Sequence, residues 1–525
     1  MRALKTALAL SLVFAAACGG DAIAPAKPKA PPVASASASA LPSASASSSA
    51  VVIADLPPPG EPKSIAPAKV VSLDTKSPAR ALAIVSKKLP IVYARIVVRA
   101  GEASSILARD PKGSKAGIAG LTAQLLKEGG AGAWTGPQLA DKIDALGTEL
   151  SVDVEADRVT FGLAVTSDKL AQAFELLGAV VTKPRFDAGE FGKLKGRQLD
   201  KLRQAQKGSG AWMARIALNR ELYGDGSPYG VLDATEATVS NVELADVKAF
   251  YAKTYVASNM LLVLAGDVDE VEAQRLAQGT FAKVSTAAAP SLTFAAPPAR
   301  SGLGTRLILV TKPDAKQADI LVARFGIPRA DPRWPALALA VQVLGGGMAG
   351  RLFVDVREKR SLAYSTYGSA RELSQGPMPV IAYAGTQHAM VRQSIDGLLE
   401  NLRWISGERP ITEGELAIAR QSLETGFVYR LETIGSVASL AIDKDTLGLP
   451  GADVYEYVAQ YRKALHEATL GAVRVEAKDV LTPTDVVIVV AGDPSLAPTL
   501  AKLGDVRVVD PEKGFVTTST VPKAP

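Results

Sequence analysis

The sequence contains very little cysteine and histidine. Its 525 residues include one cysteine, Cys18, and two histidines, His388 and His466. A single thiol excludes a disulfide framework within the chain. The two histidines lie far apart, and neither belongs to an H-x-x-E-H or H-x-x-x-H pattern, so they form no recognisable zinc motif. We interpret both histidines as solvated side chains.

A large excess of charge of either sign is also absent. Lys and Arg number 59 and Asp and Glu 53, which gives a formal charge of +6, and both signs are interspersed along the chain. This balance does not suggest a nucleic-acid partner. Hydrophobic residues make up 47% and charged residues 21%, as is typical of globular proteins, and the length is sufficient for two to four domains.

Hydrophobic runs long enough to span a membrane are missing, but a short run lies near the start. Arg2 and Lys5 precede an apolar stretch over residues 7–17, whose length suits a secretory signal. Small residues before Cys18 resemble the lipobox of bacterial lipoproteins. This resemblance implies removal of residues 1–17, lipidation of Cys18, and anchoring in the cell envelope facing the periplasm, at either the inner or the outer membrane. An ordinary signal peptide followed by an idle cysteine is the alternative.

The segment after this cysteine is predicted to be a flexible tether. Residues 18–70 are rich in Ala, Pro and Ser and contain few large apolar side chains. Such a composition does not bury enough apolar surface to offset the entropy of ordering. We therefore expect a lipid-anchored linker that connects the membrane to a folded body.

The body of the chain repeats itself once. Apolar strands that end in Ala-Gly-Asp are expected over residues 259–267 and 485–493. Alternating strands are expected over residues 91–98 and 320–327, and an apolar helix that runs into glycines follows each of them.

This repetition predicts two homologous domains. We place them at residues 71–288 and 300–510, joined by a proline-bearing linker and followed by a tail over residues 511–525. Strands with clustered helices, rather than strict alternation, favour an α+β fold in which each domain has a mostly antiparallel sheet with packed helices.

One stretch of the second half is highly specific. It reads Leu-Gly-Gly-Gly-Met-Ala-Gly-Arg-Leu-Phe-Val-Asp-Val-Arg-Glu-Lys-Arg-Ser-Leu-Ala-Tyr over residues 344–364. Together with Leu-Ala-Gly-Asp over residues 264–267 and Ser-Pro-Tyr-Gly over residues 227–230, it resembles the pitrilysin/insulinase family of zinc metallopeptidases. The resemblance covers nearly the whole body and implies the two-domain fold of the mitochondrial processing peptidases.

Members of this family bind zinc through H-x-x-E-H on a helix and a glutamate further downstream. By resemblance, the motif falls on Gly120, Ala123 and Gln124, and the downstream ligand falls near Asp200. Glycine and alanine carry no ligand atom, and a neutral amide is a poor ligand for zinc. We therefore expect no cofactor in this chain and no independent hydrolase activity.

Family enzymes complete the active site with an Arg and a Tyr seven residues apart, which by resemblance are Arg357 and Tyr364. Both are hydrogen-bond donors suited to a developing oxyanion. A surface charge and a sheet aromatic are the alternative interpretation of this pair.

Short bacterial members of the family are known as pairs, in which one subunit binds zinc and the other supplies this Arg and Tyr. The resemblance thus implies a noncatalytic subunit of a heterodimeric metallopeptidase that binds peptides and works with a zinc-bearing homologue. The alternative is a nonenzymatic scaffold or peptide-binding lipoprotein.

Two further segments are candidates for substrate contact. The family's substrate strand falls on residues 147–154, where Ser151 and Val152 are expected to pair with a peptide by β-augmentation. The glycines after the apolar helix of the second half lack the Gly-Lys-Ser/Thr ending of a P-loop. We interpret them as a flexible backbone approach near the substrate chamber or at the domain contact; they are Gly345, Gly346 and Gly347.

Overall fold

The computed structural model describes residues 67–111, 113–282, 284–294, 302 and 304–525. The predicted signal peptide, Cys18 and the linker up to residue 66 lie outside the described residues. Residues Pro67–Pro525 form one compact unit. Within the described part of the chain, no helix has the length and the apolar character needed to cross a membrane.

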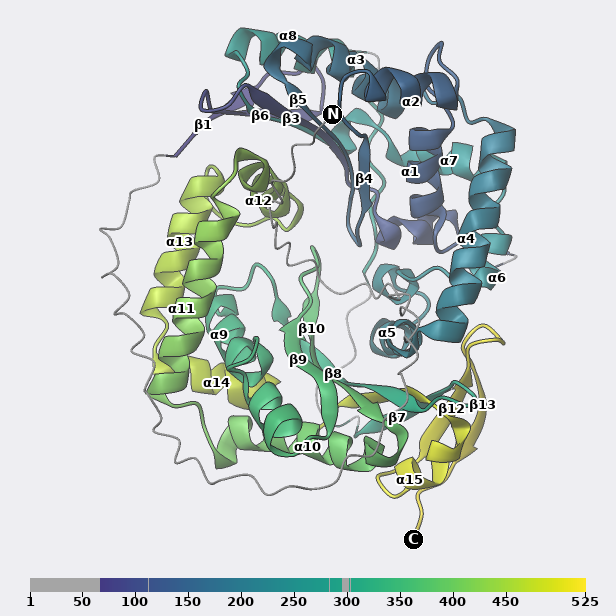
Figure 1. Ribbon diagram of the computed structural model, residues 1–525, viewed down its shortest axis with the longest axis vertical. Coiled ribbons are helices and arrows are strands. Elements are labelled where there is room, and N and C mark those ends of the chain that lie inside the picture. Colours follow the sequence, from purple (N-terminus) through teal and green to yellow (C-terminus); the bar gives the residue numbers. More distant parts are fainter. Residues whose placement is uncertain (1–66, 112, 283, 295–301, 303) are drawn as a thin grey trace, which may run out of the picture. The chain divides into compact units, whose positions relative to one another are not determined.

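The described residues of the first half form a six-stranded sheet in the order β1-β2-β6-β3-β5-β4 (Figure 1). Its strands are β1 (Lys69–Leu73), β2 (Arg80–Val85), β3 (Ile91–Val98), β4 (Ser151–Val154), β5 (Val159–Thr166) and β6 (Met260–Gly266). β2 and β6 run parallel, whereas the other neighbouring strands run antiparallel. β4 lies at one edge of this sheet.

The described residues of the second half form a seven-stranded sheet in the order β13-β12-β7-β11-β8-β10-β9. Its strands are β7 (Arg306–Thr311), β8 (Gln317–Pro328), β9 (Ala363–Ala370), β10 (Pro377–Gln387), β11 (Val487–Gly492), β12 (Val506–Asp510) and β13 (Val516–Val521). β11 pairs parallel with β7 and antiparallel with β8, as β6 does with β2 and β3. The expected duplicated α+β fold is confirmed, and β4 and β9 occupy equivalent edges.

Helices cover both sheets (Figure 1). Those of the first half are α1 (Ile118–Glu128), α2 (Gly136–Asp144), α3 (Leu170–Thr182), α4 (Ala188–Gly208), α5 (Gly210–Tyr223), α6 (Glu236–Ser240), α7 (Leu244–Thr254) and α8 (Glu270–Phe281). Those of the second half are α9 (Trp334–Gly345), α10 (Val391–Arg403), α11 (Glu413–Arg430), α12 (Ile434–Thr446), α13 (Val454–Glu467), α14 (Leu470–Val480) and α15 (Ala497–Ala501). Several begin at side-chain caps, such as the capping box of Thr412 and Glu415 at the start of α11.

Helix α12 of the second half covers one face of the first sheet. It packs against β3 and β6. Its buried Ala438 belongs to the same core cluster as Val97 of β3 and Leu261 and Val263 of β6. The alternate residues of β6, including Leu262, face the helices of the first half instead. β6 is therefore apolar throughout because both of its faces are buried.

Helix α5 of the first half covers the second sheet in the same way. It packs against β8 and β11, where Met213 and Ile216 are buried in one cluster with Leu321 and Val489. α5 follows α4, and α12 follows α11, so the two helices hold equivalent places in the repeat. Each half thus contributes a helix to the sheet of the other half, which explains why the body forms a single compact unit.

Ion pairs fix the end of α12 to the first sheet. Arg80 and Arg99 both pair with Asp445, the latter at 3.0 Å. Arg158 pairs with Asp443 at 2.7 Å. Cations at the C-terminal end of a helix also interact favourably with its dipole. The contact between the halves is therefore apolar at its centre and ionic at one end.

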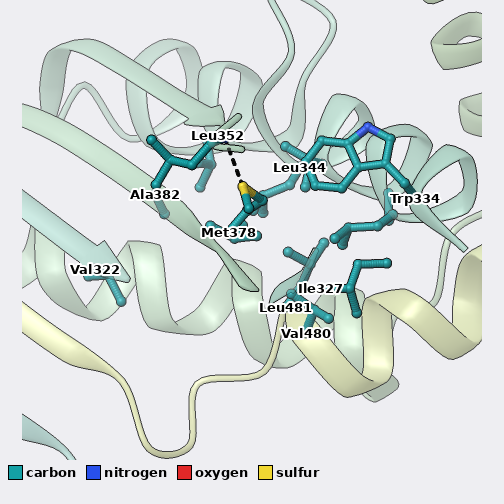
Figure 2. Packing of buried hydrophobic residues seen from close by; sticks show 14 of the residues in the cluster. Val322, Ile327, Trp334, Leu344, Leu352, Met378, Ala382, Val480 and Leu481 are labelled. Carbon is teal, nitrogen blue, oxygen red and sulfur yellow. Dashed lines mark hydrogen bonds between the residues drawn. The ribbon is translucent and has the colours of Figure 1, made fainter. Parts of the chain in front are cut away.

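The core of the second half anchors the segment over residues 344–364. Leu344 and Leu352 are fully buried. Figure 2 shows them packed near Met378 and Ala382, which belong to β10. The backbone N–H of Leu373 donates a hydrogen bond of 2.9 Å to the sulfur of Met378. These contacts fix the beginning of the segment against the sheet.

The structure places a strand within residues 511–525, the stretch that the sequence assigns to a tail. β13 lies in this stretch and pairs antiparallel with β12 at the edge of the second sheet. Its sequence Val-Thr-Thr-Ser-Thr-Val carries few large apolar side chains, because most of the strand is exposed. The apolar pattern that predicted the other strands is therefore missing here. The domain bounds at residues 71–288 and 300–510 and the tail stay predictions.

Candidate functional site

Helix α1 carries Gly120, Ala123 and Gln124, on which the family's zinc motif falls by resemblance. Gly120 and Gln124 lie on its partly exposed side, whereas Ala123 is fully buried. Residues four apart share one face of a helix, so this spacing would direct two ligands to one point. The side chains at these positions are the hydrogen atom of Gly120, the methyl group of Ala123 and the neutral amide of Gln124. None of these groups is a suitable ligand for zinc.

The carboxylate of Glu102 fills the space beside Gly120. Glu102 begins the short 3-10 helix Glu102–Ala108. A Cβ atom on Gly120 would lie 2.8 Å from Oε1 of Glu102, which is closer than van der Waals contact. The hydroxyl of Ser105 donates a hydrogen bond of 3.3 Å to the other carboxylate oxygen. A histidine at position 120 would therefore have to displace Glu102. Sequence reasoning missed this residue, because no motif links it to α1.

Burial raises the pKa of Glu102 to about 7. The negative charge of Asp233 adds to the increase, whereas hydrogen bonds from Ser105 and from the backbone of Gly120 and Gly117 oppose it. The fold thus favours the protonated carboxyl of Glu102 up to nearly neutral pH.

We expect Glu102→Gln to reduce the loss of stability that the chain undergoes between about pH 5 and about pH 8. The folded-state pKa of about 7 lies above the ordinary value of 4.5. The folded chain therefore binds the proton more tightly than the unfolded chain, and stability is lost as the pH rises through 7. Over this pH range, the free energy of unfolding of the natural chain should fall by about 1–3 kcal/mol more than that of the variant. Urea unfolding at both pH values measures the difference, and equal pH dependences would contradict the expectation.

The other candidate metal ligands do not gather at α1. Asp200 lies on α4, where its side chain is 70% exposed and pairs with Arg203. His388 begins the short 3-10 helix His388–Met390 after β10, and His466 is 78% exposed beside Glu424. Throughout the residues that the structure describes, no group of three or more His, Cys, Asp or Glu side chains is arranged to hold a metal ion.

Arg357 and Tyr364 come together on the surface of the second half. The Cζ atom of Arg357 lies 5.1 Å from the centre of the Tyr364 ring. The side chain of Arg357 is 37% exposed, and Tyr364 is 84% exposed. A guanidinium and a phenol, both hydrogen-bond donors, are therefore accessible side by side to a single ligand.

A π-helix followed by a tight turn produces this proximity. The π-helix spans Phe353–Lys359, and the N–H of Leu362 bonds to the carbonyl of Val356 at 2.9 Å. Ser361 then adopts a left-handed conformation with φ of 52°, and β9 begins two residues later with Tyr364 as its second residue. Single π-helical turns are frequent at functional sites. Nothing in the sequence pattern predicts a π-helix here.

The ion pairs around the π-helix distinguish Arg357 from its neighbours. Arg351 pairs with Glu415 of α11 at 2.7 Å, and Arg360 pairs with acidic residues of α10 and of the π-helix itself. Among the ion pairs of the described residues, Arg357 contacts only its chain neighbour Glu358, at 3.3 Å. The first two arginines therefore fasten the segment to the fold, while Arg357 remains available for a ligand.

The candidate substrate strand β4 is an edge strand. The hydroxyl of Ser151 donates a hydrogen bond of 3.2 Å to the carbonyl of Gly162 on β5. Val152 is half-buried against the core of the first half. Among the described strands, β4 pairs only with β5, so its outer edge can accept an extended peptide.

The turn after β4 is fixed to the second half. Asp157 accepts hydrogen bonds from the hydroxyl of Tyr229 at 2.8 Å and from the backbone N–H of Ser374 at 2.9 Å. Arg158, the next residue, pairs with Asp443 of α12. The position of the candidate peptide strand is therefore set by both halves.

The glycines after α9 provide a close backbone approach within the second half. A Cβ atom on Gly345 would lie 2.0 Å from the backbone nitrogen of Gly368 on β9. Gly346 lies against the side chain of Gln342, and the exposed Gly347 has a φ of 73°. The approach joins α9 to β9 and supports the strand that carries Tyr364.

The comparisons with known proteins point to one family. Residues 241–423 match a family model described as the peptidase M16 inactive domain. The chain is 27% identical over 359 residues to an uncharacterized zinc protease of Mycobacterium leprae, which covers 68% of this chain and 78% of that protein. It is 24% identical over 366 residues to a non-peptidase homolog of Helicobacter pylori, which covers 69% of this chain and 81% of that protein.

The fold is similar to that of a solved peptidase M16 inactive domain from Pseudomonas fluorescens. The TM-score is 0.69 at 25% sequence identity, and the likeness covers 81% of this chain and 98% of that structure. It therefore extends well beyond residues 241–423.

Proposed function

We propose that this chain is the zinc-free subunit of a two-subunit peptidase. The chain belongs to the peptidase M16 family, which is the pitrilysin/insulinase family, as an inactive homologue that is not a hydrolase on its own. In this role it binds peptides and supplies Arg357 and Tyr364 to the active site of a zinc-bearing homologue.

The observation that carries the proposal is the contrast between the two halves. Gly120 and Gln124 offer no zinc ligand, and Glu102 occupies the space beside Gly120. In the second half, Arg357 and Tyr364 lie next to each other and are accessible. Among the described residues, Arg357 has an ion pair only with its chain neighbour Glu358, and the adjacent phenol of Tyr364 is 84% exposed, which supports a role in contacting a ligand.

The two donors have a definite chemical use. Attack on a peptide carbonyl places negative charge on its oxygen, and donors fixed at that point lower the barrier because they are oriented before the reaction. The guanidinium of Arg357 supplies permanent charge, and the hydroxyl of Tyr364 supplies a neutral donor. The zinc-bearing partner supplies the activated water in this arrangement.

We further propose that the complex is held at the cell envelope. This part of the proposal is based on the lipobox-like residues before Cys18 and on the Ala/Pro/Ser-rich segment that follows. Lipidation at Cys18 would leave the body facing the periplasm.

Co-expression with a zinc-bearing homologue of the M16 family tests the proposed function. We expect the two chains to co-purify and to cleave a fluorogenic peptide together, whereas each chain alone shows little cleavage. The measurements are size-exclusion chromatography and the initial rate of cleavage. Full activity of the partner alone, or failure of the chains to associate, would contradict the proposal and favour a nonenzymatic scaffold or peptide-binding lipoprotein.

A further inference from the structure

A second aromatic ring contacts the guanidinium of Arg357. Its Cζ atom lies 4.6 Å from the centre of the Phe353 ring, in addition to 5.1 Å from the centre of the Tyr364 ring. Phe353 is the first residue of the π-helix and Arg357 is four residues further along. One guanidinium is therefore in contact with two aromatic rings, and we call this arrangement the aromatic stack of Phe353, Arg357 and Tyr364.

We propose that Phe353 is a positioning residue, which holds the Arg357 guanidinium in the orientation that the partner's substrate requires. This inference depends on the proposed function for its kinetic consequence, but the geometry that it assigns to Arg357 can be measured without it.

The packing around Phe353 favours this role over a structural one. Leu352 and Val356, its neighbours in the segment, are fully buried in the core cluster of the second half. Phe353 is only half-buried and is not part of that cluster. The ring of Phe353 therefore lies beside the core and in contact with the guanidinium of Arg357.

A buried counterpart in the same half shows what distinguishes the aromatic stack. Arg329 also lies between two rings, at 4.9 Å from the centre of Trp334 and 5.2 Å from that of Tyr461. Arg329 is buried, however, and both Glu372 and the hydroxyl of Tyr457 contact its guanidinium. That arrangement is closed to a ligand, whereas the aromatic stack is open on the side where Tyr364 is exposed.

The physical effect of Phe353 is to reduce the freedom of a long side chain. An exposed arginine samples many rotamers, and ordering it on binding costs entropy. Contact of a cation with an aromatic face favours one of these rotamers by a modest amount. Because a displacement of about 1 Å at a reacting group can lower a rate strongly, even this modest preference affects catalysis.

The test replaces Phe353 in the full chain by leucine, which keeps an apolar side chain but removes the ring, and by tyrosine, which keeps the ring. The first measurement is the ring-current shift of the Arg357 δ-methylene protons by NMR, assigned with Arg357→Lys. We expect Phe353→Leu to reduce this shift and Phe353→Tyr to preserve it. An unchanged shift in Phe353→Leu would overturn the proposed geometry.

The second measurement is the kcat of peptide cleavage by the complex with the zinc-bearing partner. Phe353→Leu should lower kcat by about threefold to tenfold with KM nearly unchanged, and Phe353→Tyr should restore it. If Arg357→Ala lowers kcat but Phe353→Leu does not, the positioning role is wrong. If Arg357→Ala itself has no effect on kcat, the proposed function is wrong. The NMR shift then still tests whether the ring of Phe353 contacts the guanidinium of Arg357.

Discussion

Replacing Arg357 by alanine is expected to lower the kcat of the proposed two-subunit peptidase by about 100-fold, with KM changed by less than about threefold. The guanidinium is accessible and has no tertiary ion pair among the described residues, so we expect its removal to leave the fold intact. Its charge matters most when the carbonyl oxygen of the substrate becomes negative. An interaction made mainly in the transition state affects kcat, whereas one made equally with the bound substrate would affect KM.

The same reasoning applies to Tyr364→Phe, which removes one hydroxyl and keeps the ring against Arg357. We expect a decrease in kcat of about tenfold to 100-fold, because one neutral donor is lost. Arg403→Ala provides a matched control, since Arg403 is a similarly exposed arginine of the second half, with a side chain that is 52% exposed. Steady-state rates with a fluorogenic peptide give kcat and KM for all three variants. If Arg357→Ala were no slower than Arg403→Ala, the shared active site would be ruled out.

The candidate site could be predicted only where a local sequence motif indicates its residues. The stretch over residues 344–364 indicates Arg357 and Tyr364 directly, and the absence of an H-x-x-E-H pattern indicates that the family's zinc motif is missing. The contact of Glu102 with Gly120 joins two segments without a shared motif, so no spacing could reveal it. The aromatic stack depends on a π-helix and on the left-handed Ser361, and neither follows from periodicity or composition.

The fold could be predicted as a repeat but not as an exchange of helices. β6 and β11 stand out because both are apolar throughout and end in Ala-Gly. This pattern shows that each strand is buried on two faces, yet it does not identify the helix on the second face. The apolar residues of α5 and α12 would suit either sheet. Only the three-dimensional structure shows that each helix packs on the sheet of the opposite half.

Because α5 packs on the sheet of the second half, we expect Ala214→Asp in this helix to be strongly destabilising and to act mainly on the second half. Ala214 belongs to the first half by sequence, but it is fully buried in the cluster of α5 with β8 and β11. An unpaired carboxylate at that place should lower the free energy of unfolding by about 3–5 kcal/mol. Ala211→Asp is the matched control, since Ala211 is exposed in the first turn of the same helix, where a negative charge interacts favourably with the helix dipole.

Hydrogen–deuterium exchange shows where the destabilisation acts. In Ala214→Asp, the amides of β11 (Val487–Gly492) should exchange faster than in the natural chain, although the substituted residue lies in the other half of the sequence. Urea unfolding should report a large loss of stability for this variant and a change within about 0.5 kcal/mol for Ala211→Asp. Two independently folded halves would give the opposite pattern, with faster exchange confined to residues 67–282 and an unchanged β11. The contact of Ala214 with the second sheet predicts instead that the two halves lose their structure together, because each sheet is covered on one face by the other half's helix.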